Sequence, residues 1–263
     1  MKKMFILLAL LLPLGARAQS AEDWGARLSV EGNYKIAKGV HLYAEEELRF
    51  LSSNVDDIRT TLGFTYKASK FLKMGVGYTL INVNDSSTGT FKTPRHRFFA
   101  DVSGTLKAGD FQFSLKERLQ LTHRTGTFNV YQNTPNALAL KSKFTVKYKG
   151  FYYGEPYVSF EVRTALNDPW GTASGTAQWN KTGTKTYYDY TPSGYTHVYN
   201  NRYRGEIGVN FELSKSHALK PYILVDFRSD YKIDTNSDGT RLFSAGYSNS
   251  TLFSAGLSYV FSF

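Results

Sequence analysis

Hydrophobic and polar residues alternate with a period of two along most of the chain. In the last thirteen residues, Phe253, Ala255 and Leu257 begin an apolar face that continues to the C-terminal residue. The opposite face carries serine and glycine, and Leu252 and Val260 break the pattern. A period of two over about a dozen residues predicts a strand that contacts apolar material on one side only.

The same alternation recurs in ten earlier segments, so the pattern predicts eleven strands. Each is ~10–13 residues long, which is enough for a tilted strand to cross a bilayer. The strands of soluble β-sandwiches are usually nearer ~5–6 residues. The predicted strands are 24–36, 40–50, 58–68, 71–82, 96–107, 111–122, 137–149, 153–165, 201–213, 220–231 and 251–263.

Short turns and longer polar loops alternate between these strands. One long loop, residues 166–200, is rich in Gly, Thr, Trp and Tyr. This alternation is typical of outer-membrane barrels, which have short periplasmic turns and long extracellular loops. The fold class predicted is therefore all-β, a single transmembrane antiparallel up-and-down β-barrel.

The predicted strand number has to be reconciled with the rule that bacterial barrels have an even number of strands. We expect about twelve strands, with ten as the alternative. A twelfth strand could lie in residues 242–250, whose Leu242-Phe-Ser-Ala-Gly sequence recurs at Leu252-Phe-Ser-Ala-Gly. Ten would result if one apparent strand is a hairpin within a loop.

The N-terminus predicts export. Residues 1–18 have the features of a secretory signal peptide, with Lys2 and Lys3 before an apolar run and Ala16-Arg17-Ala18 as the cleavage site. The apolar run is shorter than the ~20 residues of a membrane-spanning helix. We expect residues 19–263 to form the barrel and to reside in the outer membrane. The ending at Phe263 resembles the terminal strand that the barrel-assembly machinery recognises.

Composition agrees with this class and narrows the partners. The chain has no Cys, and aromatic residues make up 16% of it, as expected for a barrel with aromatic girdles. The net charge is +10, and removal of the signal peptide with its three cations leaves +7. Because an exported protein rarely meets nucleic acid, we expect membrane lipid, lipopolysaccharide or small anions as partners and no nucleic acid.

The polar face of three predicted strands repeats one motif. The motif is a tyrosine, an acid four residues later and an arginine two residues after that. Even spacing puts all three side chains on one face of each strand. Glu46 and Glu117 instead fall on the apolar face, and the pattern offers no reason for them. The copies are Tyr43-x-x-x-Glu47-x-Arg49, Tyr157-x-x-x-Glu161-x-Arg163 and Tyr222-x-x-x-Asp226-x-Arg228.

Most strands place a cation at a similar height on this face, with acids slightly lower. One interpretation is a plug of salt bridges that fills a narrow lumen, since buried charges must be paired or hydrated. The other is a cationic constriction that selects or holds small anionic solutes. The predicted lumen-lining charge network is Arg27, Glu31, Glu47, Arg49, Arg59, Arg97, Asp101, Arg118, Lys141, Lys143, Glu161, Arg163, Arg202, Arg204, Glu206, Asp226 and Arg228.

Catalytic signals are weak. The five histidines have no metal-ligand spacing, and no nucleophile elbow, phosphate loop or zinc-protease motif occurs. We therefore assign no catalytic residue, metal or cofactor. The alternatives are a barrel enzyme acting on lipid or peptide through His123 or His197 at the outer rim, and a soluble secreted β-barrel or sandwich binding module. The aromatic residues of 166–200 could stack on sugars or fold on themselves.

Several short motifs, in order, resemble the exported barrel family known as domain of unknown function 2490. At Leu140-Lys-Ser-Lys143 the chain departs from the expected Arg-x-Arg. The resemblance implies an outer-membrane β-barrel, and it implies no activity, substrate or catalytic residue. The motifs are Trp24, Glu47-x-Arg49, Leu62-Gly-x-x-Tyr66, Met74-Gly-Val-Gly-Tyr78, Asn201-Arg-Tyr-Arg204 and Phe263.

Overall fold

The computed structural model describes residues 21–52, 54–85, 88–179 and 186–263. The predicted signal peptide lies outside these residues. Within them, no helix is both long enough and apolar enough to cross a membrane. The strands are β1 (Ala21–Ala37), β2 (Val40–Leu51), β3 (Asn54–Lys67), β4 (Leu72–Asp85), β5 (Thr90–Phe91), β6 (Arg95–Ala108), β7 (Phe111–Arg124), β8 (Asn136–Tyr148), β9 (Glu155–Trp179), β10 (Thr186–Glu212), β11 (His217–Thr235) and β12 (Arg241–Ser262).

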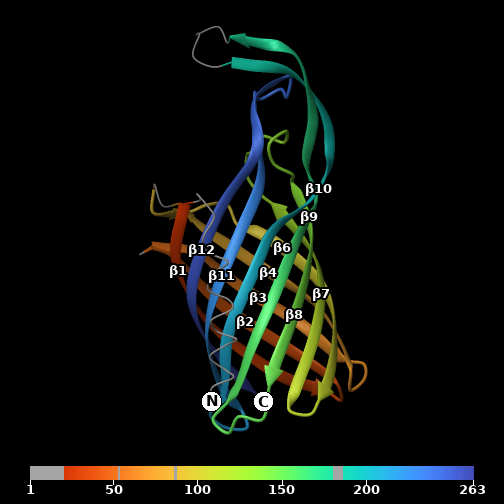
Figure 1. Cartoon of the computed structure of the whole chain (residues 1–263), viewed down its shortest axis with the longest axis vertical. Coiled ribbons are helices and arrows are strands. Elements are labelled where there is room, and N and C mark those ends of the chain that lie inside the picture. Colours follow the sequence, from red (N-terminus) through yellow and green to blue (C-terminus); the bar gives the residue numbers. More distant parts are fainter. Residues whose placement is uncertain (1–20, 53, 86–87, 180–185) are drawn as a thin grey trace.

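The strands close into a single barrel (Figure 1). Neighbours in the chain are neighbours in the wall, except that β4 pairs with β6 and that β1 pairs with β12 to complete the ring. The short strand β5 pairs with β4 in the connection to β6. The predicted all-β barrel is confirmed, with eleven strands in the wall and β5 as the twelfth.

The odd number of wall strands follows from the pairing of β1 with β12, which is parallel. Trp24 lies beside Phe253, and further along both strands Gly32 lies beside Phe261. All other wall pairs are antiparallel. A fully antiparallel ring must have an even number of strands because direction alternates, and one parallel junction removes that requirement. Residues 242–250 and 251–263 do not form two strands, since β12 runs through both.

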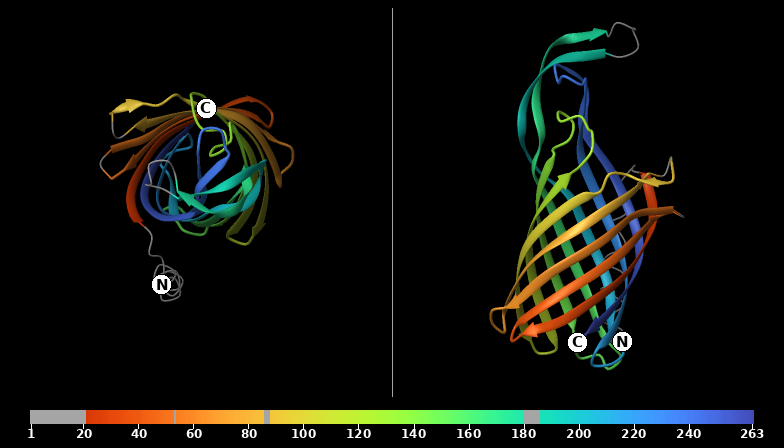
Figure 2. Two further views of the ribbon diagram at one scale, coloured as in Figure 1. Left: turned by 90° about the horizontal axis from the view of Figure 1, so that it is seen from above. Right: turned by 180° about the vertical axis from the view of Figure 1, so that it is seen from behind.

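The segment 166–200, predicted as a long loop, is instead strand where the structure describes it: residues 166–179 extend β9 and residues 186–200 extend β10. These strands rise well above the wall, and β11 and β12 rise beside them (Figures 1 and 2). The pairing of β9 with β10 is shifted between Tyr187 and Asp189, between Pro192 and Gly194, and between Gly194 and His197. The last two shifts each add one residue to β10 relative to β9, which changes the parity of the side chains, so the period of two is interrupted here.

The raised hairpins have an apolar core of their own. Tyr190, Ile233 and Leu242 are buried together, and Tyr231 packs against them. The connection from β7 to β8 supports this cap, because Asn129 Nδ2 donates to Thr235 Oγ1 at 3.2 Å. In the view along the barrel axis, the raised hairpins project over the interior (Figure 2).

The wall has an apolar outer face and a polar inner face. Leu62, Val76 and Ile223 are exposed on the outside. Leu252 and Val260, which break the terminal pattern, are instead buried on the inner face, opposite Asp226 and Ala218.

The two unexplained acids, Glu46 and Glu117, do lie on the outer face. Glu46 pairs with Val30 and is exposed there. Glu117 accepts a hydrogen bond from Ser142 Oγ at 2.6 Å on the neighbouring strand. This contact gives one of the two acids a local partner, and we have no physical account of Glu46.

Candidate functional site

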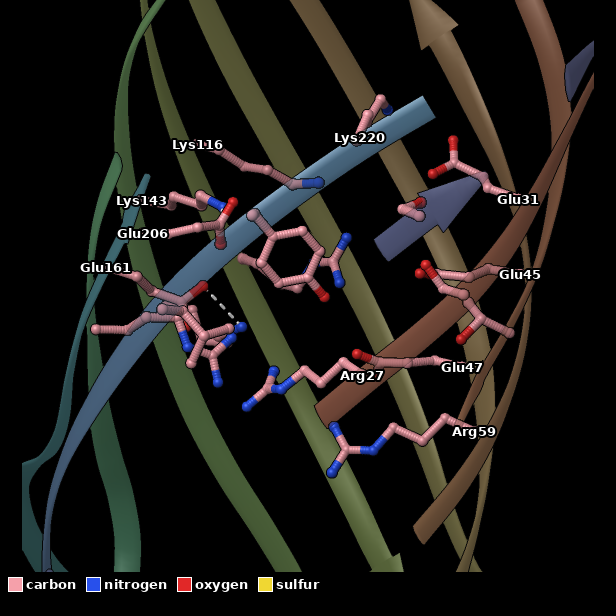
Figure 3. A pocket seen from close by; sticks show the side chains of 18 of the residues that line it. Arg27, Glu31, Glu45, Glu47, Arg59, Lys116, Lys143, Glu161, Glu206 and Lys220 are labelled. Carbon is pink, nitrogen blue, oxygen red and sulfur yellow. Dashed lines mark hydrogen bonds and ion pairs between the residues drawn. The ribbon is translucent and has the colours of Figure 1, made fainter. Parts of the chain in front are cut away.

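The lumen contains a cavity of about 490 Å³, with side chains arriving from most of the wall (Figure 3). Arg27 of β1 and Arg59 of β3 reach into it from the side that carries Glu47, and Glu161 and Glu206 stand on the opposite side. Eleven cationic and five acidic side chains line the cavity. The cavity therefore has an excess of six positive charges.

The tyrosine of each motif copy lies flat against the wall. In every copy it pairs directly with a glycine on the next strand. A Cβ atom added at Gly256 would lie 2.1 Å from Tyr222 Cζ, so the ring occupies the space of the missing side chain. Aromatic cover of glycine is a recognised device of curved sheets. The pairs are Tyr43 with Gly63, Tyr157 with Gly208, and Tyr222 with Gly256.

The acid of the third motif copy is the centre of an ion-pair network. Asp226 is fully buried. Arg204 donates to both of its oxygens, Nε to Oδ1 at 2.6 Å and Nη2 to Oδ2 at 2.8 Å. Arg27 also donates to Oδ2, at 3.2 Å. A bidentate pair of this kind fixes geometry as well as charge, so Asp226 ties β1, β10 and β11 together.

The other lumen ion pairs follow the wall. They join residues on one strand, on adjacent strands or on strands two apart, and among the described residues none spans the lumen. The charges are therefore paired around the circumference, and the centre stays free of ion pairs. The pairs are Arg49 with Glu47 (2.7 Å), Arg59 with Asp57 (2.6 Å), Arg118 with Asp101 (2.6 Å), Lys141 with Glu161 (2.8 Å) and Lys143 with Glu206 (3.2 Å).

A second cavity of about 300 Å³, here named the upper chamber, lies toward the raised hairpins. Seven arginines and three aspartates line it. Arg27, Arg49, Arg59 and Arg97 line both cavities. Four arginines therefore stand at the boundary between the two spaces.

The residues predicted to line the lumen all lie on the inner face of the wall. Asp101 and Asp226 are buried behind the surface of the cavities, each in contact with arginine. Arg163, Arg202 and Arg228 line only the upper chamber. The remaining twelve line the larger cavity: Arg27, Glu31, Glu47, Arg49, Arg59, Arg97, Arg118, Lys141, Lys143, Glu161, Arg204 and Glu206.

Several inner residues are missing from the sequence-based set. Asp57 falls outside the predicted strand, which begins at Ile58, whereas β3 begins at Asn54. Lys116 lies two residues before Arg118, so the alternation alone could have identified it. The same holds for Glu45, which precedes Glu47 by two and lies directly opposite Glu31.

The two histidines considered for catalysis contact neither serine nor carboxylate through hydrogen bonds among the described residues. His123 Nδ1 lies 2.8 Å from Asn136 Oδ1, and His197 Nε2 lies 3.2 Å from Tyr247 OH. Neither contact supplies a nucleophile with its base. Likewise, no group of three or more potential metal ligands occurs in the described ranges.

His197 belongs instead to an aromatic stack in the raised hairpins. Its ring stacks on Trp170 with centroids 4.4 Å apart and also contacts Tyr199, Tyr231 and Tyr247. Burial among these rings lowers the pKa of His197 below its ordinary value, although Asp168 opposes the effect. Part of the aromatic segment thus packs on itself, which was one of the two outcomes considered.

Fold and lumen define the class of this protein: a β-barrel with an apolar exterior and a charged, partly ion-paired interior. A family model described as "Protein of unknown function (DUF2490)" matches residues 24–227, from β1 into β11, and the chain belongs to this family. The resemblance noted in the sequence is therefore confirmed. No curated protein matches the chain.

Proposed function

We propose that the protein is an outer-membrane β-barrel, exported by its N-terminal signal peptide, that passes or binds small anionic solutes through its Arg/Lys-rich lumen. The observation that carries the proposal is the excess of cations around a cavity whose ion pairs run along the wall. These pairs leave a cavity of about 490 Å³ in the lumen, which a plug would fill.

The outer face supports the placement in a membrane. Its exposed apolar side chains form a band around the barrel, which a soluble protein would not leave in water. Tyr34 and Tyr66 are exposed near the short turns, and Phe98 and Tyr203 near the other end. Aromatic residues at both ends of an apolar band are typical of membrane interfaces. A soluble binding module would turn its apolar face inward, which is the opposite arrangement.

The lumen supports selection of anions. Rings of Arg and Lys are used in pores for anions and phosphate. Cations outnumber acids in both cavities, and four arginines stand where the cavities meet. The positive potential of a lumen lined in this way favours entry of negative solutes over positive ones.

The proposed partners follow from this placement. Membrane lipid and lipopolysaccharide would contact the outer face, and the barrel-assembly machinery would recognise β12. That strand ends beside β1, where the backbone N–H of Phe263 donates to the carbonyl oxygen of Asn33 at 2.9 Å. A small anionic solute is the partner expected in the lumen.

Fractionation tests the membrane placement. The mature protein should sediment with outer membranes and require detergent for extraction. If high-salt or alkaline washing alone releases the protein from the membrane fraction, the membrane placement is wrong and the soluble binding module is favoured.

Single-channel recording tests the anion preference. The refolded protein in a planar bilayer, under a salt gradient, should give steps whose reversal potential indicates anion selectivity. Arg97→Gln should reduce that selectivity, because Arg97 lines both cavities and its hydrogen bond goes to Thr122 rather than to an acid. Arg241→Gln, the same substitution on an exposed residue of the raised hairpins, should not. A folded but silent barrel would favour the plug.

A further inference from the structure

Three arginines lie side by side in the upper chamber. Arg202 of β10 pairs directly with Arg163 of β9 and with Arg228 of β11. All three line the chamber of about 300 Å³. Like charges directly opposite on a sheet repel. Because arginine stays protonated in proteins, this repulsion cannot be relieved by loss of a proton.

The chain compensates these charges only in part: Asp230 lines the same chamber and attracts Arg163. Within the described ranges, neither Arg163 nor Arg202 forms an ion pair, and Arg228 Nη2 lies 3.7 Å from Asp226 Oδ2. That carboxylate already accepts from Arg204 and Arg27.

Two of these half-buried side chains each have one buried donor without a partner. The Nε atoms of Arg202 and Arg228 are buried and have no hydrogen-bond partner. A buried N–H donor without an acceptor is unfavourable. An anion from outside the chain would supply the missing acceptors.

One acceptor stands among these donors. Asn201 Nδ2 donates to Asp230 Oδ1 at 3.0 Å, and this contact fixes the orientation of the amide because a carboxylate can only accept. Asn201 Oδ1 is then a buried acceptor without a donor. Both residues line the chamber. A ligand that carries acceptor oxygens together with one O–H group would satisfy both kinds of atom.

We propose that Arg163, Arg202 and Arg228 bind a phosphate group, as inorganic phosphate or a soluble phosphate monoester. The guanidinium groups donate to the phosphate oxygens, since arginine recognises phosphate through paired N–H donors. Asn201 accepts from the P–OH of the singly protonated form. Sulfate is fully ionised near neutral pH and offers no such hydrogen. The inference deepens the proposed function and rests on it in one respect, that small anions enter the lumen.

Calorimetric titration of the refolded mature protein in detergent tests this site. Inorganic phosphate, sulfate and glycerol phosphate are separate titrants at one ionic strength. Phosphate should bind, and sulfate should bind about tenfold more weakly, as the loss of one hydrogen bond in a charged site implies. Arg202→Gln should weaken phosphate binding by about tenfold or more, which is the value of one charge-assisted hydrogen bond.

Two further variants make the test specific. Asn201→Ala should reduce the difference in binding affinity between phosphate and sulfate. Arg241→Gln, outside the chamber, should bind phosphate as the unmodified protein does. Circular dichroism verifies that each variant is folded, which we expect for Arg202→Gln because it removes a repulsive charge.

Absence of phosphate binding, or unchanged binding by folded Arg202→Gln, would overturn the site. Equal binding of sulfate would overturn the assignment of phosphate. A separate titration with micelles containing phosphatidic acid distinguishes the source, and binding of the lipid phosphate alone would exclude a soluble ligand. If the protein binds phosphate but gives no conductance steps in bilayers, the phosphate site stands and the proposed passage of anions through the lumen is wrong. If it gives anion-selective conductance steps but binds no phosphate, the passage of anions stands and the phosphate site is wrong.

Discussion

Arg204 and Asp226 form a bidentate ion pair inside the barrel, with N–O distances of 2.6 and 2.8 Å. The carboxylate is fully buried and also accepts a hydrogen bond from Arg27, which lies on the other side of the β1–β12 junction. One acid thus holds two cations, Arg204 and Arg27, whose charges would otherwise repel each other. The first prediction concerns this residue.

Asp226→Asn should strongly destabilise the barrel. Removal of one partner of a buried ion pair leaves uncompensated charge and typically costs ~3–5 kcal/mol. Urea unfolding of the refolded protein in micelles, followed by circular dichroism, should show a clear fall in the midpoint. Asp238→Asn, at the exposed tip between β11 and β12, is the control and should leave it unchanged. Equal midpoints for the two variants would contradict the central role of Asp226.

Gly256→Ala should also destabilise the barrel, because its Cβ would meet the ring of Tyr222. Overpacking of this kind costs ~1–3 kcal/mol. Gly104→Ala is a matched control in β6, since a Cβ there meets nothing within 4 Å. The same unfolding assay should separate the two variants. Adding Tyr222→Ala to Gly256→Ala should recover part of the loss, because the two residues are in contact; full additivity would count against the packing argument.

Ile223→Arg should impair membrane insertion. Ile223 is 68% exposed on the outer face, midway along the wall part of β11. An arginine on the lipid face near the midplane costs ~2–4 kcal/mol. Folding into lipid vesicles, followed by resistance to protease, should show a reduced folded fraction. Tyr152→Arg in the short turn before β9, also highly exposed, should fold normally, and similar yields for both variants would argue against a membrane around β11.

The raised hairpins should loosen as the pH falls. The folded state lowers the pKa of His197 mainly through burial, so the neutral ring is favoured there. In the opened state the pKa returns to about 6.5. The stabilisation is therefore complete above that value and is lost as pH falls from it toward the lower folded pKa. Tryptophan fluorescence, which reports on Trp170 in contact with His197, should change in this window.

Two variants isolate the source of that change. His197→Phe retains an aromatic ring and should abolish the pH dependence. His123→Phe, whose histidine lies at the rim beside Asn136, should retain it. If the fluorescence change persists in His197→Phe, another group causes it, and the neighbouring Asp168 would be examined next.

Most of the wall could be predicted from local sequence. The alternation in residues 40–50 and 111–122 fits β2 and β7 closely, because each residue's face follows from its parity alone. The alternation failed in the upper parts of β9 and β10, where bulges change the parity several times. It also missed Asp57, because the predicted strand begins at Ile58 whereas β3 begins at Asn54.

The candidate site likewise has features that follow from local sequence and features that do not. Parity within a strand determined, from the sequence alone, which charges face inward and which apolar residues face outward. Only the tertiary structure decided three further features. These are the parallel pairing that closes the barrel, the covering of Gly256 by Tyr222, and the side-by-side placement of Arg163, Arg202 and Arg228. Arg27 and Asp226 are 199 residues apart. Their contact depends on the register of β1, β12 and β11 around the ring, and register between distant strands is a property of the closed sheet rather than of any single strand.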